Sequence, residues 1–384
     1  MKNDRLRELD LLRFIAAVAV MMHHFTGVRY YTPWRDATKV FPVAHKFTGY
    51  GYLGVQLFFV ISGFVILMSA WDRRPGDFAV SRFVRLFPAY WCGVLLVLLV
   101  FFLTGESTGY PVSKVGPIER VLPNLTMLQT GIGAPDSESV YWTLWVEIHF
   151  YALISLLVWR GITYSRAMVF MGGWLLAGVF AVESGDRLAN TLLIPQHAPY
   201  FAAGMAFFLI YRYGGNLALW GFATGCWALA VYYGVRYVSP FTTQPRYDDY
   251  AIPAIITAIF LVMALVATGR LSWLRWRQLT LLGALTYPLY LVHETVSRPI
   301  ITVLRDGNNP WVVVAFAAAV SLSVAWLVHH WVELPLQRAL RPRLLYALDQ
   351  MRADLPRFGN GPEREVGALA DPALTAGSTP GPPE

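Results

Sequence analysis

Charged side chains are scarce in this chain. Asp, Glu, Lys and Arg together make up 14% of its 384 residues, whereas hydrophobic residues make up 56%. An ordinary soluble domain has about 25% charged residues. A soluble globule with so few could not cover its surface, so we expect much of the surface to face lipid. The long apolar runs also lack the apolar–polar alternation of membrane β-strands, which excludes a β-barrel and favours helices.

Cysteine is rare too. The two cysteines, Cys92 and Cys226, fall inside separate apolar stretches, which suits buried thiols and favours neither a disulfide nor a metal site. We therefore expect no metal. The net charge of +7 could indicate a nucleic-acid partner, but the basic residues lie at the ends of apolar stretches rather than in one patch. A nucleic-acid partner is not expected, and the sequence shows no internal repeat.

The apolar stretches predict an all-α, polytopic membrane protein. Windows of about 19 residues give about ten transmembrane helices. They cover residues 10–28, 52–70, 86–103, 141–159, 166–182, 198–212, 217–234, 250–268, 279–301 and 311–330. Lys and Arg are more frequent on the side of the N-terminus, so the positive-inside rule predicts that both termini are cytoplasmic.

The chain divides into a membrane domain at residues 1–340 and a cytoplasmic tail at 341–384. The tail begins with basic residues, and the segment 336–348 mixes Leu, Arg and Tyr as expected at the inner membrane surface. After about Asp354 the chain is rich in Pro, Gly, Ala and acidic residues without any apolar period. This composition predicts disorder.

Ionisable residues inside the first span indicate a functional site. A charged side chain within a span costs about 2.5–3.5 kcal/mol on insertion scales, so its presence needs a reason. Arg13 and His24 are eleven residues apart, which places them within about 20° of the same helix face and about 16 Å apart along the axis. His23 points about 80° away from that face. Asp10 lies one turn before Arg13 and can pair with it.

Three ionisable residues are predicted to lie at a similar depth in the outer half of the membrane. His24 is near the outer end of the first span, Glu147 lies just inside the fourth, and His293 lies in the outer half of the ninth. Convergence of His and Glu at one level suits general acid–base catalysis. It would equally suit a proton-coupled transporter, so depth alone leaves both open.

Two arginines stand one turn apart before the third span. Arg82 and Arg85 are either ordinary positive-inside anchors or a phosphate clamp, since paired guanidinium groups suit bidentate contacts to phosphate. In the second span, Gly51, Gly54 and Gly63 favour close helix packing or leave room for a thin ligand chain.

In this order the motifs resemble the acyltransferase-3 family of bacterial membrane proteins, which use acyl-CoA to O-acylate surface and secreted glycans. The resemblance extends from about residue 5 to about residue 340. It rests on Asp10 with Arg13 and His24, the segment 54–64, Arg82 with Arg85 and Pro88, the segments 142–151 and 287–293, and Glu333-Leu-Pro335. The chain departs from the family at Gln56 and Ile148, where many members carry acidic residues. The second departure leaves Glu147 without a carboxylate neighbour.

The resemblance implies an acyl-CoA-dependent O-acyltransferase of the bacterial inner membrane, with acetyl-CoA as the expected donor. Arg82 and Arg85 would hold the donor phosphates, with Arg13, supported by Asp10, near the pantetheine arm. His24 would act as general base or as covalent nucleophile.

On the acceptor side, Glu147 would orient His24 or bind a sugar hydroxyl, and Trp142 and His293 would contact the substrate. The acceptor would be a glycan, an exopolysaccharide precursor or a lipid-linked saccharide. The alternative is a secondary transporter or glycan flippase, with His24, Glu147 and His293 as a proton relay. The absence of a repeat and the paired arginines count against it.

Overall fold

The computed structural model describes residues 6–28, 33–105, 117–237 and 245–354, and within these ranges the regular elements are all helices. The long helices are α1 (Arg7–Met22), α4 (Gly54–Ala70), α5 (Pro75–Thr104), α7 (Trp142–Arg160), α8 (Tyr164–Ser184), α10 (Ala198–Tyr213), α11 (Leu217–Arg236), α12 (Pro245–Ala267), α13 (Gln278–Leu304), α14 (Pro310–Leu327) and α15 (Leu334–Asp354). The shorter ones are η1 (His23–Gly27), α2 (Ala37–Val40), α3 (His45–Thr48), η2 (Gly49–Leu53), α6 (Pro117–Leu125), α9 (Arg187–Leu193) and η3 (Val328–Glu333).

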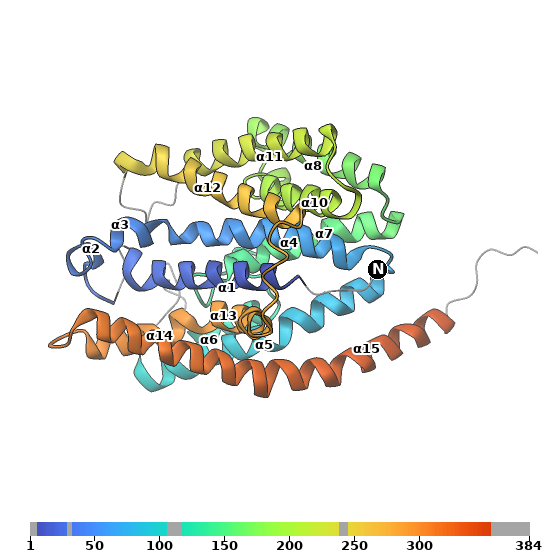
Figure 1. The fold of residues 1–384 in the computed structure, drawn as a ribbon. Helices are drawn as coiled ribbons and strands as arrows, with labels where there is room; N and C mark the ends of the chain where they lie inside the picture. Colours follow the sequence, from blue (N-terminus) through green and yellow to red (C-terminus); the bar gives the residue numbers. More distant parts are fainter. Residues whose placement is uncertain (1–5, 29–32, 106–116, 238–244, 355–384) are drawn as a thin grey trace, which may run out of the picture.

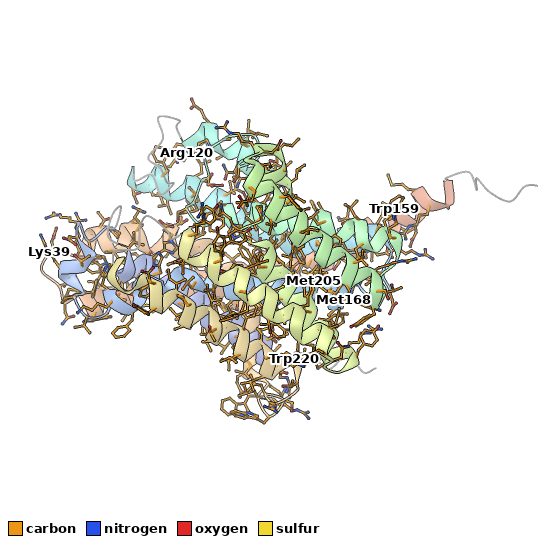
Figure 2. All side chains as sticks on the ribbon, turned by 90° about the horizontal axis from the view of Figure 1, so that it is seen from above. Lys39, Arg120, Trp159, Met168, Met205 and Trp220 are labelled. Carbon is orange, nitrogen blue, oxygen red and sulfur yellow. The ribbon has the colours of Figure 1, made fainter. Side chains whose placement is uncertain are left out.

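Among the described residues, nine helical stretches are long and apolar enough to cross a membrane. This confirms the predicted all-helical, multi-pass fold, and large apolar side chains such as Trp159 lie exposed on the outside of the bundle (Figure 2). The expected span at 279–301 is not among the nine. It is α13, a helix of 27 residues, about 40 Å long. Polar residues, including His293 and Glu294, lower its hydropathy and lie buried inside the protein.

The helices form a bundle in which α1, α4 and α13 are central (Figure 1). On one side of α1 and α4 lie α8, α10, α11 and α12, and on the other lie α5, α14 and α15. The shortest predicted span, 198–212, is α10. In the membrane-length stretch that includes α10, 83% of the residues are buried, whereas the share is 28% in α8 and 28% in α11. Helix α10 lies inside the bundle, packed along α4.

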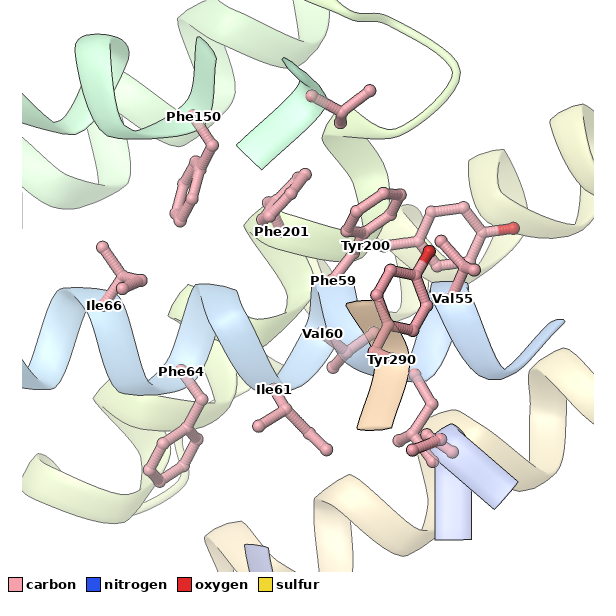
Figure 3. Close-up of a cluster of buried hydrophobic side chains, with 14 of the residues drawn as sticks. Val55, Phe59, Val60, Ile61, Phe64, Ile66, Phe150, Tyr200, Phe201 and Tyr290 are labelled. Carbon is pink, nitrogen blue, oxygen red and sulfur yellow. The ribbon is translucent and has the colours of Figure 1, made fainter. Parts of the chain in front are cut away.

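Small residues allow the central helices to approach closely. A Cβ atom on Gly63 of α4 would overlap the carbonyl oxygen of Phe201, and one on Gly204 of α10 would overlap that of Val60. Beside this crossing, the ring of Phe201 stacks on Phe59 at 4.7 Å and on Phe150 at 4.2 Å (Figure 3). The predicted close packing at Gly63 is therefore confirmed, with α10 as the partner helix.

The same device brings α1 against α4. A Cβ atom on Gly54 would lie 2.6 Å from the carbonyl oxygen of Ala16 and 3.0 Å from Cγ2 of Val20. One on Gly51 would overlap the carbonyl oxygen of Ala19. Both contacts are with backbone, which cannot move away, so the two glycines fix the distance between α1 and the start of α4.

The predicted boundary at residue 340 falls inside α15, which continues from α14 through η3 and extends past the bundle (Figure 1). Near its end, Nη2 of Arg352 lies 2.9 Å from Oδ1 of Asp77 at the start of α5. The predicted disorder concerns residues 355–384, which lie outside the described residues.

Candidate active site

A large cavity opens between α1, α4, α5, α7, α13 and α15, with a volume of about 1070 Å³. We call it the arginine-lined cavity, because seven of its lining residues are arginines. They are Arg13, Arg73, Arg82, Arg85, Arg277, Arg338 and Arg341. The carboxylates among the described lining residues are Asp10 and Glu147, so the wall carries a surplus of positive charge.

Several of these guanidinium groups lie close enough to repel one another. Arg73 lies in the turn between two membrane-length helices. Its pKa is lowered first by burial and then by the positive charges of Arg82 and Arg341. Grouped cations of this kind favour an anionic ligand, because a bound anion relieves their mutual repulsion.

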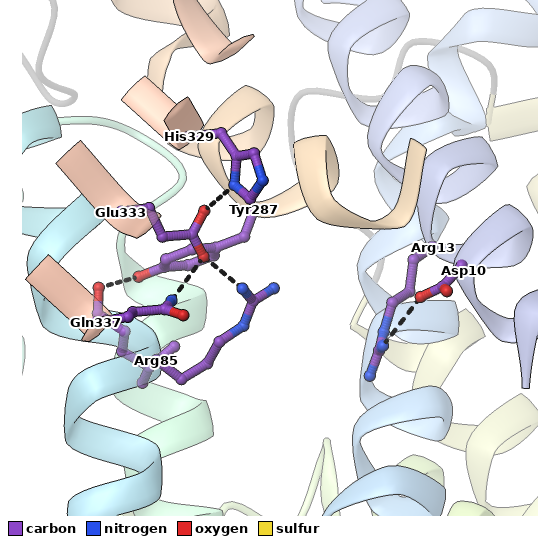
Figure 4. A network of polar contacts seen from close by, with 8 residues as sticks. Asp10, Arg13, Arg85, Tyr287, His329, Glu333 and Gln337 are labelled. Carbon is purple, nitrogen blue, oxygen red and sulfur yellow. Dashed lines mark hydrogen bonds and ion pairs between the residues drawn. The ribbon is translucent and has the colours of Figure 1, made fainter. Parts of the chain in front are cut away.

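Arg13 and Asp10 lie together on α1, as the sequence predicted. Nη1 of Arg13 is 3.9 Å from Oδ1 of Asp10 (Figure 4). Asp10 is buried, and Gly283 of α13 packs directly against its side chain. Arg13 is 28% exposed and lines the cavity. The buried carboxylate thus holds a guanidinium group at the cavity wall.

Arg82 and Arg85 both line this cavity but differ in their partners. Nη2 of Arg82 donates to Oγ of Ser81 at 3.0 Å, and its guanidinium lies 5.7 Å and 5.9 Å from the ring centres of Phe78 and Tyr151. Arg85 instead forms an ion pair with the buried carboxylate of Glu333. The predicted pair is therefore asymmetric: a carboxylate already balances the charge of Arg85.

Glu333 is the centre of a small polar network (Figure 4). Its Oε2 lies 2.7 Å from Nδ1 of His329, and its Oε1 accepts from Nε2 of Gln337 at 3.0 Å. Arg85 also lies 5.7 Å from the ring centre of Tyr287. The network joins α5, η3 and α15, and so holds α15 against the cavity.

Glu147 belongs to the arginine-lined cavity as well. Its Oε1 accepts a hydrogen bond from Tyr151 Oη at 2.5 Å, and Ser62 Oγ lies 3.5 Å away. The sequence predicted Glu147 beside His24, but His24 lines a different cavity. The two cavities adjoin, so Glu147 and His24 line neighbouring spaces, and the predicted role of Glu147 toward His24 or a sugar hydroxyl stays a prediction.

A smaller cavity of about 390 Å³ adjoins the first. We call it the histidine-lined cavity, since His23 and His24 both lie on its wall with Trp142, Glu294 and Arg298. Trp142 is 36% exposed, and its indole lies 5.5 Å from the ring of His197. The predicted contact of Trp142 with the substrate stays a prediction, and the structure places its side chain on this cavity wall.

The imidazole rings of His24 and His293 meet in the protein interior. Nδ1 of His24 lies 3.0 Å from Nε2 of His293. The other nitrogen of His293, Nδ1, lies 3.1 Å and 2.9 Å from the carbonyl oxygens of Leu289 and Tyr290. Carbonyl oxygens only accept hydrogen bonds, so Nδ1 of His293 carries the hydrogen and, in the neutral ring, Nε2 accepts.

This arrangement fixes the tautomer of His24. Its Nδ1–H donates to Nε2 of His293, so Nε2 of His24 carries the lone pair, and no residue in the described part of the chain donates a hydrogen bond to it. His24 lines the histidine-lined cavity, whereas His293 is fully buried. A basic nitrogen is thereby made available at a cavity wall, which is the requirement for a general base or a nucleophile.

His23 has a different environment. Its Nδ1 lies 3.1 Å from the carbonyl oxygen of Thr48, so it donates to backbone, and the residue is 4% exposed. The two histidines have different hydrogen-bond partners, Thr48 for His23 and His293 for His24, although both residues line the same cavity. They belong to η1, a π-helical turn that follows α1. π-Turns of this kind are frequent at functional sites.

Sequence reasoning missed part of each cavity. In the histidine-lined cavity, Oε2 of Glu294 accepts from Ser139, and its Oε1 lies 2.9 Å from Nη2 of Arg298. In the other cavity, Arg73, Arg277, Arg338 and Arg341 were interpreted only as topological anchors. Their number near one end of the bundle was a usable signal. No group of three or more potential metal ligands occurs in the parts of the chain that the structure describes.

Comparison with known proteins identifies one family. The family model described as "Acyltransferase domain", acyltransferase-3, matches residues 6–330. The chain is 26% identical over 329 residues to the acyltransferase MdmB of Streptomyces mycarofaciens, covering 77% of this chain and 79% of that protein. No solved structure matches the chain significantly.

Two further relatives carry names that refer to polysaccharides. The chain is 24% identical over 381 residues to the putative peptidoglycan O-acetyltransferase YrhL of Bacillus subtilis, covering 82% of this chain and 56% of YrhL. It is 32% identical over 120 residues to the exopolysaccharide production protein ExoZ of Rhizobium meliloti, covering 29% of this chain and 35% of ExoZ.

Proposed function

The chain belongs to the acyltransferase-3 family, and we propose that this multi-pass membrane acyltransferase moves an acyl group from acyl-CoA to a hydroxyl of a glycan. The observation that carries the proposal is the meeting of two cavities, one lined by arginines and the other by an imidazole with a free Nε2. The transporter alternative has no comparable support from the relatives.

The arginine-lined cavity suits the donor. Coenzyme A carries a diphosphate and a 3′-phosphate, and guanidinium groups bind phosphate in bidentate geometry. Arg82 and Arg341 lie within electrostatic range of Arg73, and the three would bind the phosphates. Arg13, further along α1, would then lie near the pantetheine arm. The volume of about 1070 Å³ supports a ligand of this size.

His24 would act as the general base. The acceptor oxygen attacks the thioester carbonyl carbon while its proton passes to Nε2 of His24. As the new C–O bond forms, the C–S bond breaks, and the proton passes to the departing sulfur. The products are an O-acyl ester and free CoA thiol. His293 is a positioning residue, because it holds the tautomer of His24 without lining the cavity.

The histidine-lined cavity would receive the acceptor. Its volume of about 390 Å³ suits one or two sugar units, Trp142 offers an aromatic surface, and Glu294 and Arg298 offer polar groups. The names of YrhL and ExoZ support a polysaccharide acceptor. We further propose that acyl-CoA binds from the cytoplasm, that the acceptor enters from the opposite side, and that the membrane is the bacterial inner membrane.

The protein purified in detergent tests the activity. Wild type should release CoA thiol from acetyl-CoA, and the His24→Ala variant should not, as measured with a thiol-reactive dye. A transporter would release none with either protein. Mass spectrometry of surface and secreted glycans from a deletion strain should then show which O-acetyl group is lost.

Sealed vesicles of known orientation test the geometry. Transfer should require acyl-CoA on the side of the N-terminus and should modify acceptor supplied on the other side. Transfer only when both substrates are on the same side would contradict the arrangement across the membrane but would leave the enzymatic activity intact.

A further inference from the structure

Among the described residues, the walls of the two cavities share two side chains, Val55 and Tyr290. Val55 lies in the first turn of α4, and Tyr290 lies on α13. Each residue is only 7% exposed, and Figure 3 shows the two side chains near each other. The two cavities therefore share a part of their walls that an isopropyl group and a phenol ring form.

Tyr290 is held in one position. Its hydroxyl lies 2.8 Å from Oγ1 of Thr143 and 3.3 Å from the carbonyl oxygen of Val140. Thr143 already donates its own hydrogen to Val140 at 2.8 Å. The Tyr290 hydrogen is therefore used within the protein, and Phe58 packs edge-on against the ring at 5.7 Å. At this junction Tyr290 provides a fixed ring rather than a free hydrogen-bond donor.

Val55 is held as firmly, because it follows Gly54 at the close crossing of α4 with α1. A Cβ atom at Gly54 would lie 2.6 Å from the backbone of Ala16, so the two helices are already in contact. The Val20 side chain lies at the same crossing and lines the histidine-lined cavity. The start of α4, which carries Val55, thus has no room to move toward α1, the helix that leads to His24.

We propose that Val55 and Tyr290 form the binding surface for the acyl group and restrict the enzyme to short, uncharged acyl chains. This inference rests on the proposed function. If the donor lies in the arginine-lined cavity and His24 acts in the other, the thioester carbon must lie where the cavities meet. The groups beside it are then carbon atoms of Val55, Phe58 and the Tyr290 ring.

Such a surface discriminates by size. An apolar pocket distinguishes substrates that differ by one methylene by about 10- to 200-fold. Wild type should therefore prefer acetyl-CoA to propionyl-CoA and butyryl-CoA. Val55→Ala removes two methyl groups from the wall and should raise the butyryl-to-acetyl product ratio by about 10-fold or more. Val55→Ile adds one carbon and should lower the propionyl-to-acetyl ratio.

The experiment is a competition between equal concentrations of acetyl-, propionyl- and butyryl-CoA, with the released esters measured by mass spectrometry. Val60→Ala is the matched control. Val60 is a fully buried valine on the same helix, and it lines neither cavity. It should cost similar stability and leave the product ratio unchanged.

Opposite shifts of the ratio in Val55→Ala and Val55→Ile, with none in Val60→Ala, support the inference. Ratios within twofold of wild type in both Val55 variants would overturn it. If Val55→Ala does not fold, the Val55→Ile variant alone decides. Failure of wild type to transfer any of the three acyl groups would instead refute the proposed function.

Discussion

Nδ1 of His24 and Nε2 of His293 lie 3.0 Å apart, although the residues are separated by 269 positions in the chain. The other ring nitrogen of His293, Nδ1, donates to the backbone carbonyl oxygens of Leu289 and Tyr290. The contact therefore orients the His24 ring and decides which of its nitrogens is basic. It makes α13 part of the proposed catalytic site, although its hydropathy separates it from the nine candidate spans.

His24→Ala should abolish acyl transfer, because it removes the proposed base. A positioned base contributes about 10²- to 10⁴-fold in rate. His23→Ala should keep substantial activity, since the Nδ1 atom of His23 donates to the backbone carbonyl of Thr48. Steady-state rates of both variants, with thermal unfolding measured in detergent, distinguish the roles. An inactive His23 variant beside an active His24 variant would contradict the assignment.

His293→Ala should lower kcat by about 10- to 100-fold and leave the KM for acyl-CoA nearly unchanged. The physical reason is that His24 loses the acceptor that fixes its tautomer, while the donor site is intact. His293→Gln, whose amide oxygen can accept a hydrogen bond, should recover part of the rate. An equal loss in the Ala and Gln variants would argue against a positioning role.

Arg82→Gln should raise the KM for acyl-CoA with little change in kcat. Arg82 lines the cavity, and among the described residues no carboxylate forms an ion pair with it that would compete with a phosphate. Arg343→Gln is the matched control, because Arg343 is exposed on α15 and does not line the cavity. Titration with CoA and dephospho-CoA measures the effect. Equal affinity for CoA in both variants would mean that Arg82 does not bind the donor and serves only as a positive-inside anchor.

Arg85→Gln should act mainly on stability. The substitution leaves the buried Glu333 without its charged partner, which costs about 1–3 kcal/mol. The double variant Arg85→Gln/Glu333→Gln should recover part of that loss, since the unpaired charge is gone. Thermal unfolding of the two single variants, Arg85→Gln and Glu333→Gln, and of the double variant in detergent tests the coupling. If the double variant is as unstable as the sum of the two single variants, the pair is not coupled.

Gly54→Ala should destabilise the protein by about 1–3 kcal/mol, as expected for overpacking. Its Cβ would lie 2.6 Å from the Ala16 carbonyl oxygen. Gly172→Ala on α8 is the control, because nothing lies within 4 Å of that Cβ. This change should leave stability equal or raise it by about 0.5–1 kcal/mol. Similar unfolding temperatures for both variants would contradict the importance of the α1–α4 contact.

Much of the fold could be predicted, because burial in lipid requires long apolar helices. Each predicted span corresponds to a helix, including the buried α10. The sequence could not predict which helix packs against which. Gly63 indicated close packing, but only the structure identifies Phe201 as the residue it meets. The π-turn at His23–Gly27 was also unpredictable, since it depends on tertiary contacts.

The candidate site was predictable where its contacts are local. Asp10 and Arg13 are three residues apart on one helix, so their pairing follows from helix geometry. The pairing of Arg85 with Glu333 joins residues 248 positions apart. The sequence around Arg85 does not indicate Glu333 as its partner, and the sequence around Glu333 does not indicate Arg85. Depth correctly brought His24 and His293 to one level, but it could not reveal that Glu147 faces a separate cavity.

The helix that joins Arg13 to His24 constrains how many residues can lie between them. Arg13 and His24 line different cavities and are joined by one continuous stretch of helix. Exchanging one apolar residue for another between them leaves both side chains in place. Deleting a single codon there would turn the imidazole by about 100° and draw it back by about 1.5 Å, away from His293. In this stretch the number of residues is constrained more tightly than their identity.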